Sequence, residues 1–591
     1  MKYIAIDIET IGLHPYNGSI WMIAINNEKK IMLYENCNGL KQCPAQLRKL
    51  LEDKTICKVI HNGQFDMPYI ELTWGICIRN VWDTMVTEKN IQGVTIDDRK
   101  VSENFKAAHS ASLFYTLKRY GFKTYDKTIR ENFINRPIGV PFTEAEKKYA
   151  KNDVRDLLKL QKAQEYLAIR DGQLEKILLD NKVVEKVSRM RVLGIGVDEK
   201  KWLKVAEKNL QKYETAKRSL PCVVENWNSP AQVKFYFQHR HNITIDSFVN
   251  IKKIYIKSRN PELGLFIKVR DMYSDATGYG KTWLYRDDAT SYVDDDGRVR
   301  SSFDQNKNTG RFSTSDPNIL GMPREGDHRS CIISRPGYSF VIGDFTGHEL
   351  AIMAAASGET LWQNALLRGD DVHALMASIL SPERWHTGRK KNCTFPKKCK
   401  CPDHISQRIP AKESNFLLAY GGGSSKLLER IIKNIFDKGL PTDHDMEMVM
   451  SEKESAVFVK RHKRAIPKLV RYLNKNGSDA IKTGVSYSAD PYRSRRVLQG
   501  AESWQVRNQG MNNPIQAAGA NCLKLALISM PDEFNIVLPF HDELVAEVPD
   551  GKVKQCVKVM TKVMEDSVDY ITGIHGLSKA DVRVQKDYTK H

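Results

Sequence analysis

Three acidic motifs within the first 153 residues constrain the fold of this chain more than any other feature. Asp7 and Glu9 end the first apolar stretch, which predicts a strand, and alternation along a strand places both carboxylates on one face. Asp66 follows a second apolar stretch, and Asp153 lies four residues after Tyr149 in a segment with helical spacing. Short apolar strands alternate with helical stretches over residues 1 to about 168, and this alternation predicts an α/β domain.

This set of side chains suits the hydrolysis of a phosphodiester by two metal ions. Carboxylate oxygens hold two hard cations about 4 Å apart, one of which makes hydroxide from water while the other stabilises the leaving 3′ oxygen. The phenol of Tyr149 can orient the attacking water. Ordinary surface acids are the alternative for any single motif, but three motifs in this order favour a nuclease site.

Two further aspartates lie far apart in the sequence. Asp344 ends an apolar stretch that predicts a buried strand, and Asp542 lies in a polar turn between two other predicted strands. A pair of aspartates on a rigid sheet can hold two Mg²⁺ ions that activate a primer 3′ hydroxyl and neutralise a triphosphate. The sequence leaves open whether the two side chains meet in space.

A spacing of four residues marks one predicted helix between these two aspartates. One face of this helix carries Arg408, Lys412, Phe416 and Tyr420. Arg408 can bind a triphosphate through bidentate hydrogen bonds, and Lys412 can bind it as a point charge. Phe416 can lie against the sugar and base, and Tyr420 can cover the templating position by stacking. The alternative is an amphipathic helix whose cations extend into solvent.

The N-terminal motifs resemble a known family. Asp-x-Glu, Asn-x-x-Phe-Asp and Tyr-x-x-x-Asp in this order are similar to the proofreading 3′→5′ exonuclease of the DnaQ-like type, which has an RNase H-like fold. The resemblance implies that Tyr149 orients the water and that Thr10 and Leu13 hold the 3′ nucleotide. It implies metal ligation by Asp7, Glu9, Asp66 and Asp153.

The later motifs resemble family A DNA polymerases of the bacterial polymerase I large-fragment type. Residues 344–350 are similar to motif A, the helix of Arg408 to motif B and residues 541–543 to motif C. Residues 309–314 resemble the primer-template loop, and residues 512–516 resemble the minor-groove segment. Together with the exonuclease motifs, the resemblance covers nearly the whole chain in the family's order.

This second resemblance implies a role for each residue that matches a motif. It implies that Asp344, Asp542, Glu543 and Lys412 are catalytic and that the two aspartates bind the metal ions. Binding of the deoxynucleoside triphosphate falls to Arg408, Lys412, Phe416, Tyr420, His373 and Glu349. DNA binding falls to Arg311, Asn512, Gln516 and His541. Glu349 matches the steric gate against a 2′ hydroxyl, and Arg311 and Gln516 can reach minor-groove acceptors common to all base pairs.

The resemblance also implies a multidomain α/β architecture in which an RNase H-like exonuclease precedes a right-hand polymerase. We expect the exonuclease at residues 1–168, and the thumb with the first part of the palm at 169–335, the thumb itself at about 200–285. We expect the palm at residues 336–591, with fingers inserted at about 360–510 and motif C in its C-terminal part. Because the chain begins with the exonuclease strand, we expect no separate 5′-nuclease domain and no leader peptide.

A cysteine-rich segment just before the helix of Arg408 has no explanation in this family. Cys393, Cys399, Cys401 and His404 could bind one structural Zn²⁺ tetrahedrally, although the short Cys-x-Cys spacing is unusual for zinc ribbons. The alternative is a basic loop with reduced thiols. In either case the lysines of this segment could contact template DNA.

Composition agrees with a polyanionic partner. The net charge of +20 favours nucleic acid, and we expect primer-template DNA and deoxynucleoside triphosphates as partners, with Mg²⁺ as cofactor and Mn²⁺ as a substitute. Eleven cysteines in 591 residues indicate a reducing compartment, and no apolar run is long enough for a membrane span. We therefore expect a cytoplasmic monomer, in the cytoplasm of a bacterial host if the chain is phage-encoded. A helicase or processivity partner is left open.

The favoured function is replicative, template-directed DNA synthesis with 3′→5′ proofreading. A repair or lesion-bypass polymerase with a decayed exonuclease is one alternative, which the four intact N-terminal carboxylates disfavour. An exonuclease with a non-catalytic DNA clamp is another, which the Arg408 motif and the two distant aspartates disfavour. A structural nucleic-acid protein would need neither set of acids. A phage-like branch is favoured by departures from the family's usual residues at Gly347, Ala351, Leu320 and Ala517.

Overall fold

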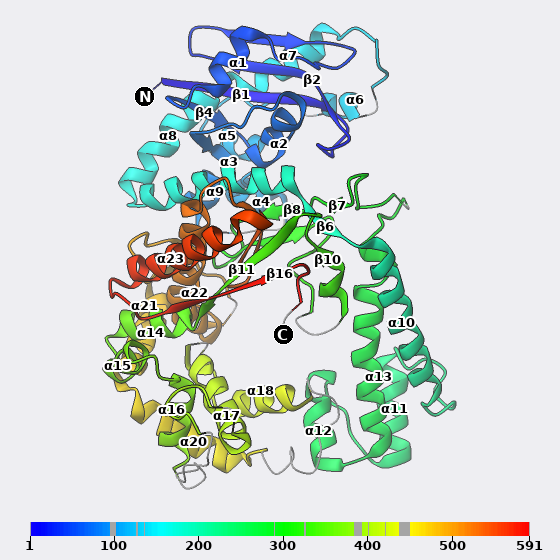
Figure 1. Cartoon of the computed structure of the whole chain (residues 1–591), viewed down its shortest axis with the longest axis vertical. Helices are drawn as coiled ribbons and strands as arrows, with labels where there is room; N and C mark the ends of the chain where they lie inside the picture. Colours follow the sequence, from blue (N-terminus) through cyan, green and yellow to red (C-terminus); the bar gives the residue numbers. More distant parts are fainter. Residues whose placement is uncertain are drawn as a thin grey trace.

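The computed structural model comprises an N-terminal α/β domain and a larger C-terminal part, in which groups of helices lie on either side of a central sheet (Figure 1). The described residues are 2–94, 102–125, 128–134, 136–288, 290–323, 327–382, 393–399, 401–419, 421–436, 449–500 and 502–589. No helix within these segments is long and apolar enough to cross a bilayer.

The N-terminal domain is built on one mixed sheet with the strand order β3-β2-β1-β4-β5. Its strands are β1 (Lys2–Ile11), β2 (Ser19–Asn26), β3 (Ile31–Glu35), β4 (Ile56–Ile60) and β5 (Val81–Asp83). β1 pairs antiparallel with β2 and parallel with β4. The central strands are mostly buried on both faces because helices cover the sheet, which explains their nearly continuous apolar sequences. The predicted α/β organisation of this region is confirmed.

Two helices bring further acids toward the end of β1. They are α2 (Gly63–Trp74) and α7 (Glu144–Arg155). α7 begins at a capping box, in which the Glu146 N–H donates to the Thr143 hydroxyl while the Thr143 N–H donates to the Glu146 carboxylate. α7 packs on β1 and β2. This defined start places Tyr149 and Asp153, one turn apart, on the buried side of the helix.

One long helix, α9 (Leu174–Leu193), joins the two halves of the molecule. It packs against α2 and β5 of the N-terminal domain and against α22 (Ser503–Ser529) and β14 (Asn535–Phe540) of the C-terminal part. Val184 belongs to the hydrophobic core of the N-terminal domain, whereas Val183 and Val187 belong to that of the C-terminal part. A helix with apolar residues on several faces is buried between neighbours, so α9 fixes the two halves to each other.

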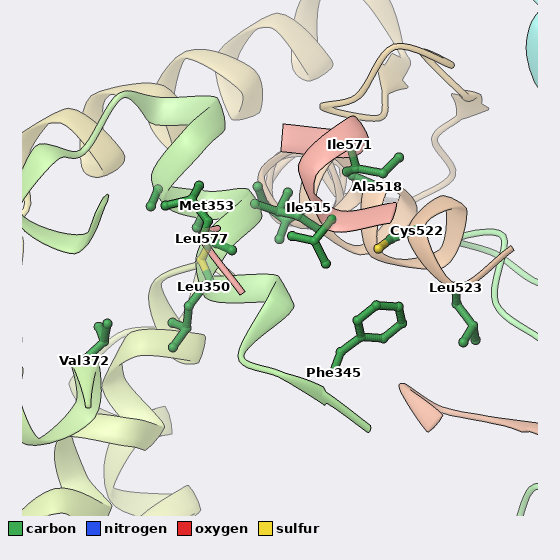
Figure 2. Close-up of a cluster of buried hydrophobic side chains, with 14 of the residues drawn as sticks. Phe345, Leu350, Met353, Val372, Ile515, Ala518, Cys522, Leu523, Ile571 and Leu577 are labelled. Carbon is green, nitrogen blue, oxygen red and sulfur yellow. The ribbon is translucent and has the colours of Figure 1, made fainter. Parts of the chain in front are cut away.

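The central sheet has the antiparallel strand order β14-β15-β11-β16. Its other strands are β11 (Tyr338–Thr346), β15 (Glu543–Pro549) and β16 (Lys579–Gln585), and the helices on one face are α14 (His348–Ser357), α22 and α23 (Val553–Thr572). Figure 2 shows part of this layer, to which Phe345, Ile515 and Cys522 belong. Trp202 and Trp283 belong to the core on the opposite face. Packing on both faces holds the strand ends rigidly.

Two groups of helices flank the central sheet (Figure 1). One group consists of α10 (Glu199–Arg218), α11 (Pro230–His241), α12 (Ile251–Ser258) and α13 (Pro261–Gly278). The other includes α16 (Val372–Leu380), α17 (Pro402–Ala419), α18 (Ser424–Phe436), α20 (Glu452–Ala465) and α21 (Pro467–Thr483). The groups meet where α18 packs on α12, with Leu428 and Ile432 in one core with Ile251. The predicted helix of Arg408 is confirmed as α17, which begins earlier than its motif.

Candidate active sites

The first group of carboxylates lies where β1 meets α7. One ligand oxygen each of Asp7, Glu9 and Asp153 lies within 4.8 Å of the others. Asp7 and Glu9 share a face because they are two residues apart on β1, and Asp153 reaches them from α7. Three carboxylates at this spacing can hold hard divalent cations. The structure therefore brings together three of the four predicted ligands.

Asp66 lines the same cavity and has a partner on β1. The main-chain N–H of Ile8 donates to its carboxylate at 3.2 Å. Burial raises the pKa of Asp66 to about 8. A divalent cation beside the carboxylate would reverse this shift, because a nearby positive charge favours the ionised form. The position of Asp66 therefore fits the fourth predicted ligand.

Tyr149 stands beside these acids with its phenol protonated. Burial raises the pKa of Tyr149, and the charges of Asp153, Glu9 and Asp7 raise it further. A protonated phenol can donate a hydrogen bond to a water molecule. The ring packs against Phe133 with 6.1 Å between the ring centroids, which restricts the direction of the hydroxyl. This geometry suits the predicted role in orienting water.

The turn after β1 forms another wall of this cavity, whose volume is about 420 Å³. Gly12 has a φ of +73°, and its carbonyl accepts hydrogen bonds from the hydroxyls of Thr10 and Tyr69, both at 2.9 Å. The turn leaves Leu13 58% exposed at the cavity, where it can contact the apolar face of a nucleotide. Sequence reasoning missed Arg130, which also lines this cavity, because a single arginine in a polar segment carries no pattern.

Asp344 and Asp542 meet at one end of the central sheet. Asp344 pairs in register with Glu543 on β15 and, on its other side, with Asp581 on β16. The main-chain N–H of Phe345 donates to the carbonyl of Asp542 at 3.2 Å, which joins the turn to the end of β11. Both aspartates line a cavity of about 950 Å³. The question that the sequence left open is therefore answered by the strand register.

Glu543, the residue after Asp542, binds neighbouring side chains that help to form the cavity wall. Its buried carboxylate accepts hydrogen bonds from Arg583, at 3.0 Å, and from the hydroxyl of Tyr588. Glu543 thereby holds Arg583, which lines the cavity together with Asp581 and the exposed His541. Sequence reasoning missed Asp581 and Arg583, although the strict alternation of polar and apolar residues along the C-terminal strand, which places both on one face, was a usable signal.

α17 presents its predicted row of side chains to the same cavity. The cavity wall includes Arg408, Lys412 and Phe416. The Nε of Arg408 donates to Asp371 Oδ2 at 2.6 Å, while Asp371 Oδ1 accepts from the main-chain N–H of His373 at 3.0 Å and so caps α16. The start of α16 therefore fixes the direction of the Arg408 guanidinium. Tyr420, the last member of the row, lies outside the described residues.

His373 faces this cavity as a neutral imidazole. Burial and the charge of Arg408 lower the pKa of His373 to about 3. The amide nitrogen of Asn415 lies 2.8 Å from its Nδ1, and because an amide nitrogen only donates, Nδ1 accepts and the proton stays on Nε2. The ring centroid lies 5.6 Å from that of Phe416. His373 can therefore donate one hydrogen bond from Nε2 to an anionic ligand.

Two protein families match this chain. The family described as DNA polymerase family A matches residues 200–585, and that described as 3′-5′ exonuclease matches residues 1–165. The first match covers more than half of the chain. This chain belongs to DNA polymerase family A. The family resemblance predicted from the motifs is confirmed, and the predicted phage-like branch stays a prediction.

Individual relatives of this family A polymerase are distant. DNA polymerase I of Treponema pallidum is 24% identical over 563 residues, which cover 89% of this chain and 50% of the relative. The thermostable DNA polymerase I of Thermus aquaticus is 25% identical over 285 residues, which cover 46% of this chain and 30% of the relative. The chain spans half or less of the length of these curated relatives. The polymerase domain of M. smegmatis Pol1 was solved with DNA primer-template and dNTP, and its structure superposes on this chain with a TM-score of 0.77 at 18% identity. The match covers 99% of this chain and 95% of the M. smegmatis domain, so the two share a fold.

Glu349 and Arg311 form an ion pair at the cavity of the polymerase. The Nη2 of Arg311 lies 2.7 Å from the Glu349 carboxylate, and both residues line the cavity beside Asp344. Asn512 and Gln516 lie on α22, two turns and one turn before Ala520, which lines the cavity. The structure therefore groups Glu349 with Arg311 directly and places the two amides along the helix that borders the site.

The cysteine-rich segment of the polymerase forms a separate cluster at the start of α17. One ligand atom each of Cys393, Cys399, Cys401 and His404 lies within 4.8 Å of the others. All but Cys393 are buried. The four side chains predicted to converge therefore do so.

Proposed function

We propose that this chain is a DNA-directed DNA polymerase that extends a primer 3′ end and removes mispaired nucleotides at a separate 3′→5′ exonuclease site. The observation that carries the proposal is the meeting of Asp344 and Asp542 at a cavity that also contains Arg408 and Lys412. Two carboxylates that share a cavity with a guanidinium and an ammonium suit a metal-bound triphosphate. The M. smegmatis relative, solved with DNA primer-template and dNTP, supports this assignment.

The donor set at the polymerase cavity fits divalent cations, Mg²⁺ first and Mn²⁺ as a substitute. Asp344 and Asp542 would hold the ions, because both present hard carboxylate oxygens from a sheet packed on both faces. Ions bound there would lower the pKa of the primer 3′ hydroxyl and neutralise charge on the triphosphate. Asp581, the register partner of Asp344, adds negative charge that a cation would balance.

The residues opposite the acids would bind the incoming nucleotide. Arg408, oriented by Asp371, donates to the phosphates through the remaining nitrogens of its guanidinium, and Lys412 adds a positive charge that can also supply a proton to the departing pyrophosphate. His373 donates from Nε2. Phe416 offers its ring to the sugar and base. Because two cations and one neutral donor act together, the site favours the triphosphate over an uncharged nucleoside.

Selection of the deoxy sugar would fall to Glu349. Its carboxylate is held by Arg311 at 2.7 Å, so it cannot easily turn away to make room for a 2′ hydroxyl. Arg311 is 47% exposed in its side chain, and the other nitrogens of its guanidinium can reach a minor-groove acceptor when DNA binds while Nη2 keeps its contact with Glu349. The pair therefore couples sugar selection to the presence of a paired primer end.

The exonuclease site would act on a frayed 3′ end. Asp7, Glu9 and Asp153, with Asp66 beside them, fit the ligands of divalent cations, which supply hydroxide and stabilise the leaving oxygen when bound. Tyr149 would donate to the attacking water. Leu13 would hold the terminal nucleotide away from its partner base.

Both activities on one chain favour a replicative role over repair or lesion bypass, because the exonuclease keeps its full set of acids. We assign the exonuclease to residues 1–168, the thumb to about 200–285, the fingers to about 360–510 and the palm to the central sheet with its helices. We further propose that the chain works as a monomer on primer-template DNA. The fold that the chain shares with the M. smegmatis polymerase domain supports the right-hand arrangement.

Primer extension on matched and 3′-mismatched primers tests the proposal. We expect Asp344→Ala to lose synthesis and keep mismatch removal, and Asp7→Ala to do the reverse. Asp288→Ala, an exposed carboxylate outside both cavities, is the matched control and should keep both activities. Synthesis by Asp344→Ala at the wild-type rate, or loss of both activities in each of the two variants, would contradict two separate sites.

A further inference from the structure

We propose that Cys393, Cys399, Cys401 and His404 bind one structural Zn²⁺ that fastens the start of α17 to the loop that precedes it. The metal site stands on its own geometry. Its consequence for nucleotide binding rests on the proposed function. The cluster lies apart from both carboxylate sites, and neither site uses these four side chains.

The distances between the ligand atoms match a tetrahedral zinc site. The Sγ atoms of Cys393 and Cys399 lie 3.9 Å apart, and Cys393 Sγ lies 3.6 Å from His404 Nδ1. With Zn–S bonds of about 2.3 Å and Zn–N bonds of about 2.0 Å, tetrahedral angles place two sulfurs about 3.8 Å apart and a sulfur and a nitrogen about 3.5 Å apart. A disulfide would require about 2.05 Å between sulfurs. The four atoms therefore surround a volume of the size that one zinc ion occupies.

The chemistry of the ligands selects zinc over the cations of the carboxylate sites. Three thiolates and one imidazole are soft or borderline donors, whereas Mg²⁺ prefers oxygen. Cys399, Cys401 and His404 are at most 8% exposed. Four protein ligands also fill the tetrahedron and leave no position for water or substrate. This is the composition of a structural site rather than a catalytic one.

The ligands come from two segments that zinc would join. Cys393 and Cys399 belong to the loop before α17. The carbonyl of Cys401 accepts from the N–H of Ile405 at 2.9 Å and so opens the first turn of the helix, on which His404 lies. His404 is four residues before Arg408, so the metal would sit one turn before the first residue of the nucleotide row.

Pro410 explains why a metal ion would stabilise the start of α17. It lies inside α17 and has no N–H, so one hydrogen bond of the helix ladder is missing there. The turns before it, which carry His404 and Arg408, are therefore less firmly joined to the turns that carry Lys412 and Phe416. A metal ion bound by His404 would fix the first turns of α17 to the preceding loop.

The loop that zinc would order also touches the nucleotide cavity. Lys398, next to Cys399, lines that cavity. The carbonyl of Pro396 accepts from the N–H of Asp371 at 2.8 Å, and Asp371 is the carboxylate that orients Arg408. Loss of the metal should therefore disturb Lys398 and the Asp371–Arg408 pair together, which weakens triphosphate binding more than it slows the chemical step.

Metal analysis of the full chain tests the site directly. Protein made with zinc in the medium and purified without chelator should contain about one Zn²⁺ per chain by plasma mass spectrometry. X-ray absorption at the zinc edge should show three sulfur neighbours and one nitrogen. A content below about a tenth of an equivalent after incubation with excess Zn²⁺ and desalting, or a shell of oxygen and nitrogen only, would overturn the proposal.

Variants locate the metal on these residues. Cys401→Ser and His404→Ala should lose most of the zinc, whereas Cys222→Ser, at an exposed cysteine of no cluster, should retain it. Limited proteolysis of the C-terminal part reports whether each variant is folded. Cys401→His keeps a zinc ligand and should recover the metal. Full zinc content in Cys401→Ser would place the ion elsewhere and refute the site.

Steady-state kinetics tests the consequence for the nucleotide. We expect zinc-free Cys401→Ser to show a KM for the deoxynucleoside triphosphate raised about tenfold with a smaller change in kcat, and Cys401→His to restore it. An unchanged KM in a zinc-free, folded variant would refute the positioning role. If wild-type protein carried zinc but made no DNA, the proposed function would fail while the metal site stood.

Discussion

The most informative stability test is at a buried group of charges between α9 and α22. Asp180 on α9 accepts hydrogen bonds from Lys176 at 2.5 Å and from Lys524 of α22 at 2.8 Å, and the exposed fractions of these side chains are 0%, 3% and 0%. Lys524 also donates to Asn306 at 2.8 Å, just before the loop that carries Arg311. Burial alone would raise the pKa of Asp180, but the two lysines lower it to about 2. The carboxylate is therefore charged at neutral pH.

The magnitude of each substitution follows from which charges are left without a counter-ion. Asp180→Ala leaves Lys176 and Lys524 buried without their counter-ion, and burial already lowers the pKa of Lys524 to about 7 with the carboxylate in place. Removal of one partner from a buried ion pair costs about 3–5 kcal/mol of unfolding free energy. Lys524→Met keeps the apolar stem and leaves Asp180 paired with Lys176. It should cost about 1–2 kcal/mol for the lost hydrogen bonds. Asp180→Ala should therefore be the more damaging change, although each substitution removes one charge.

Urea unfolding followed by tryptophan fluorescence measures this difference, with limited proteolysis to follow the C-terminal part separately because a chain of several domains need not unfold in one step. In the double variant, Lys524→Met should recover part of the loss caused by Asp180→Ala, since one buried amine that has lost its counter-ion is replaced by an apolar group. Glu225→Ala, at an exposed carboxylate, is the control and should change the unfolding free energy by less than about 0.5 kcal/mol. Equal costs for the two single variants, or strict additivity in the double variant, would refute the reasoning.

Three further predictions concern the two sites. Phe416→Tyr should raise the incorporation of dideoxynucleotides, and a competition assay that shows unchanged selectivity would contradict the placement of this ring against the sugar. Glu349→Ala should increase ribonucleotide incorporation at least about tenfold, since the carboxylate that Arg311 holds is removed, and equal discrimination in wild type and variant would remove the basis for the gate. Tyr149→Phe should slow mismatch removal about 10-fold or more while primer extension stays constant, because only the water-orienting hydroxyl is lost, and wild-type exonuclease rates would exclude that role.

Local patterns in the sequence determined much of the fold and most of the site residues. Alternation placed Asp7 and Glu9 on one face of β1, and a spacing of four placed Arg408, Lys412 and Phe416 along α17. These relations depend only on the periodicity of a strand or a helix, so they can be read without knowledge of the rest of the chain.

Only the tertiary structure decided which of these local rows face one another. Asp344 meets Asp542 and Asp581 because the antiparallel register of β11 with its two neighbours places them at one sheet end. The Asp371–Arg408 pair likewise depends on how α16 packs against α17. Such contacts join residues far apart in the chain, and their geometry is set by strand register and side-chain packing, which no local periodicity encodes.

The cysteine-rich segment shows the same division. The sequence supplied three thiols and one imidazole but left a basic loop with reduced thiols as the alternative. The structure brings one atom of each within 4.8 Å of the others, beside the first turn of α17. A metal site needs four donors at one point in space, and the fold of the loop against the helix decides whether that point exists.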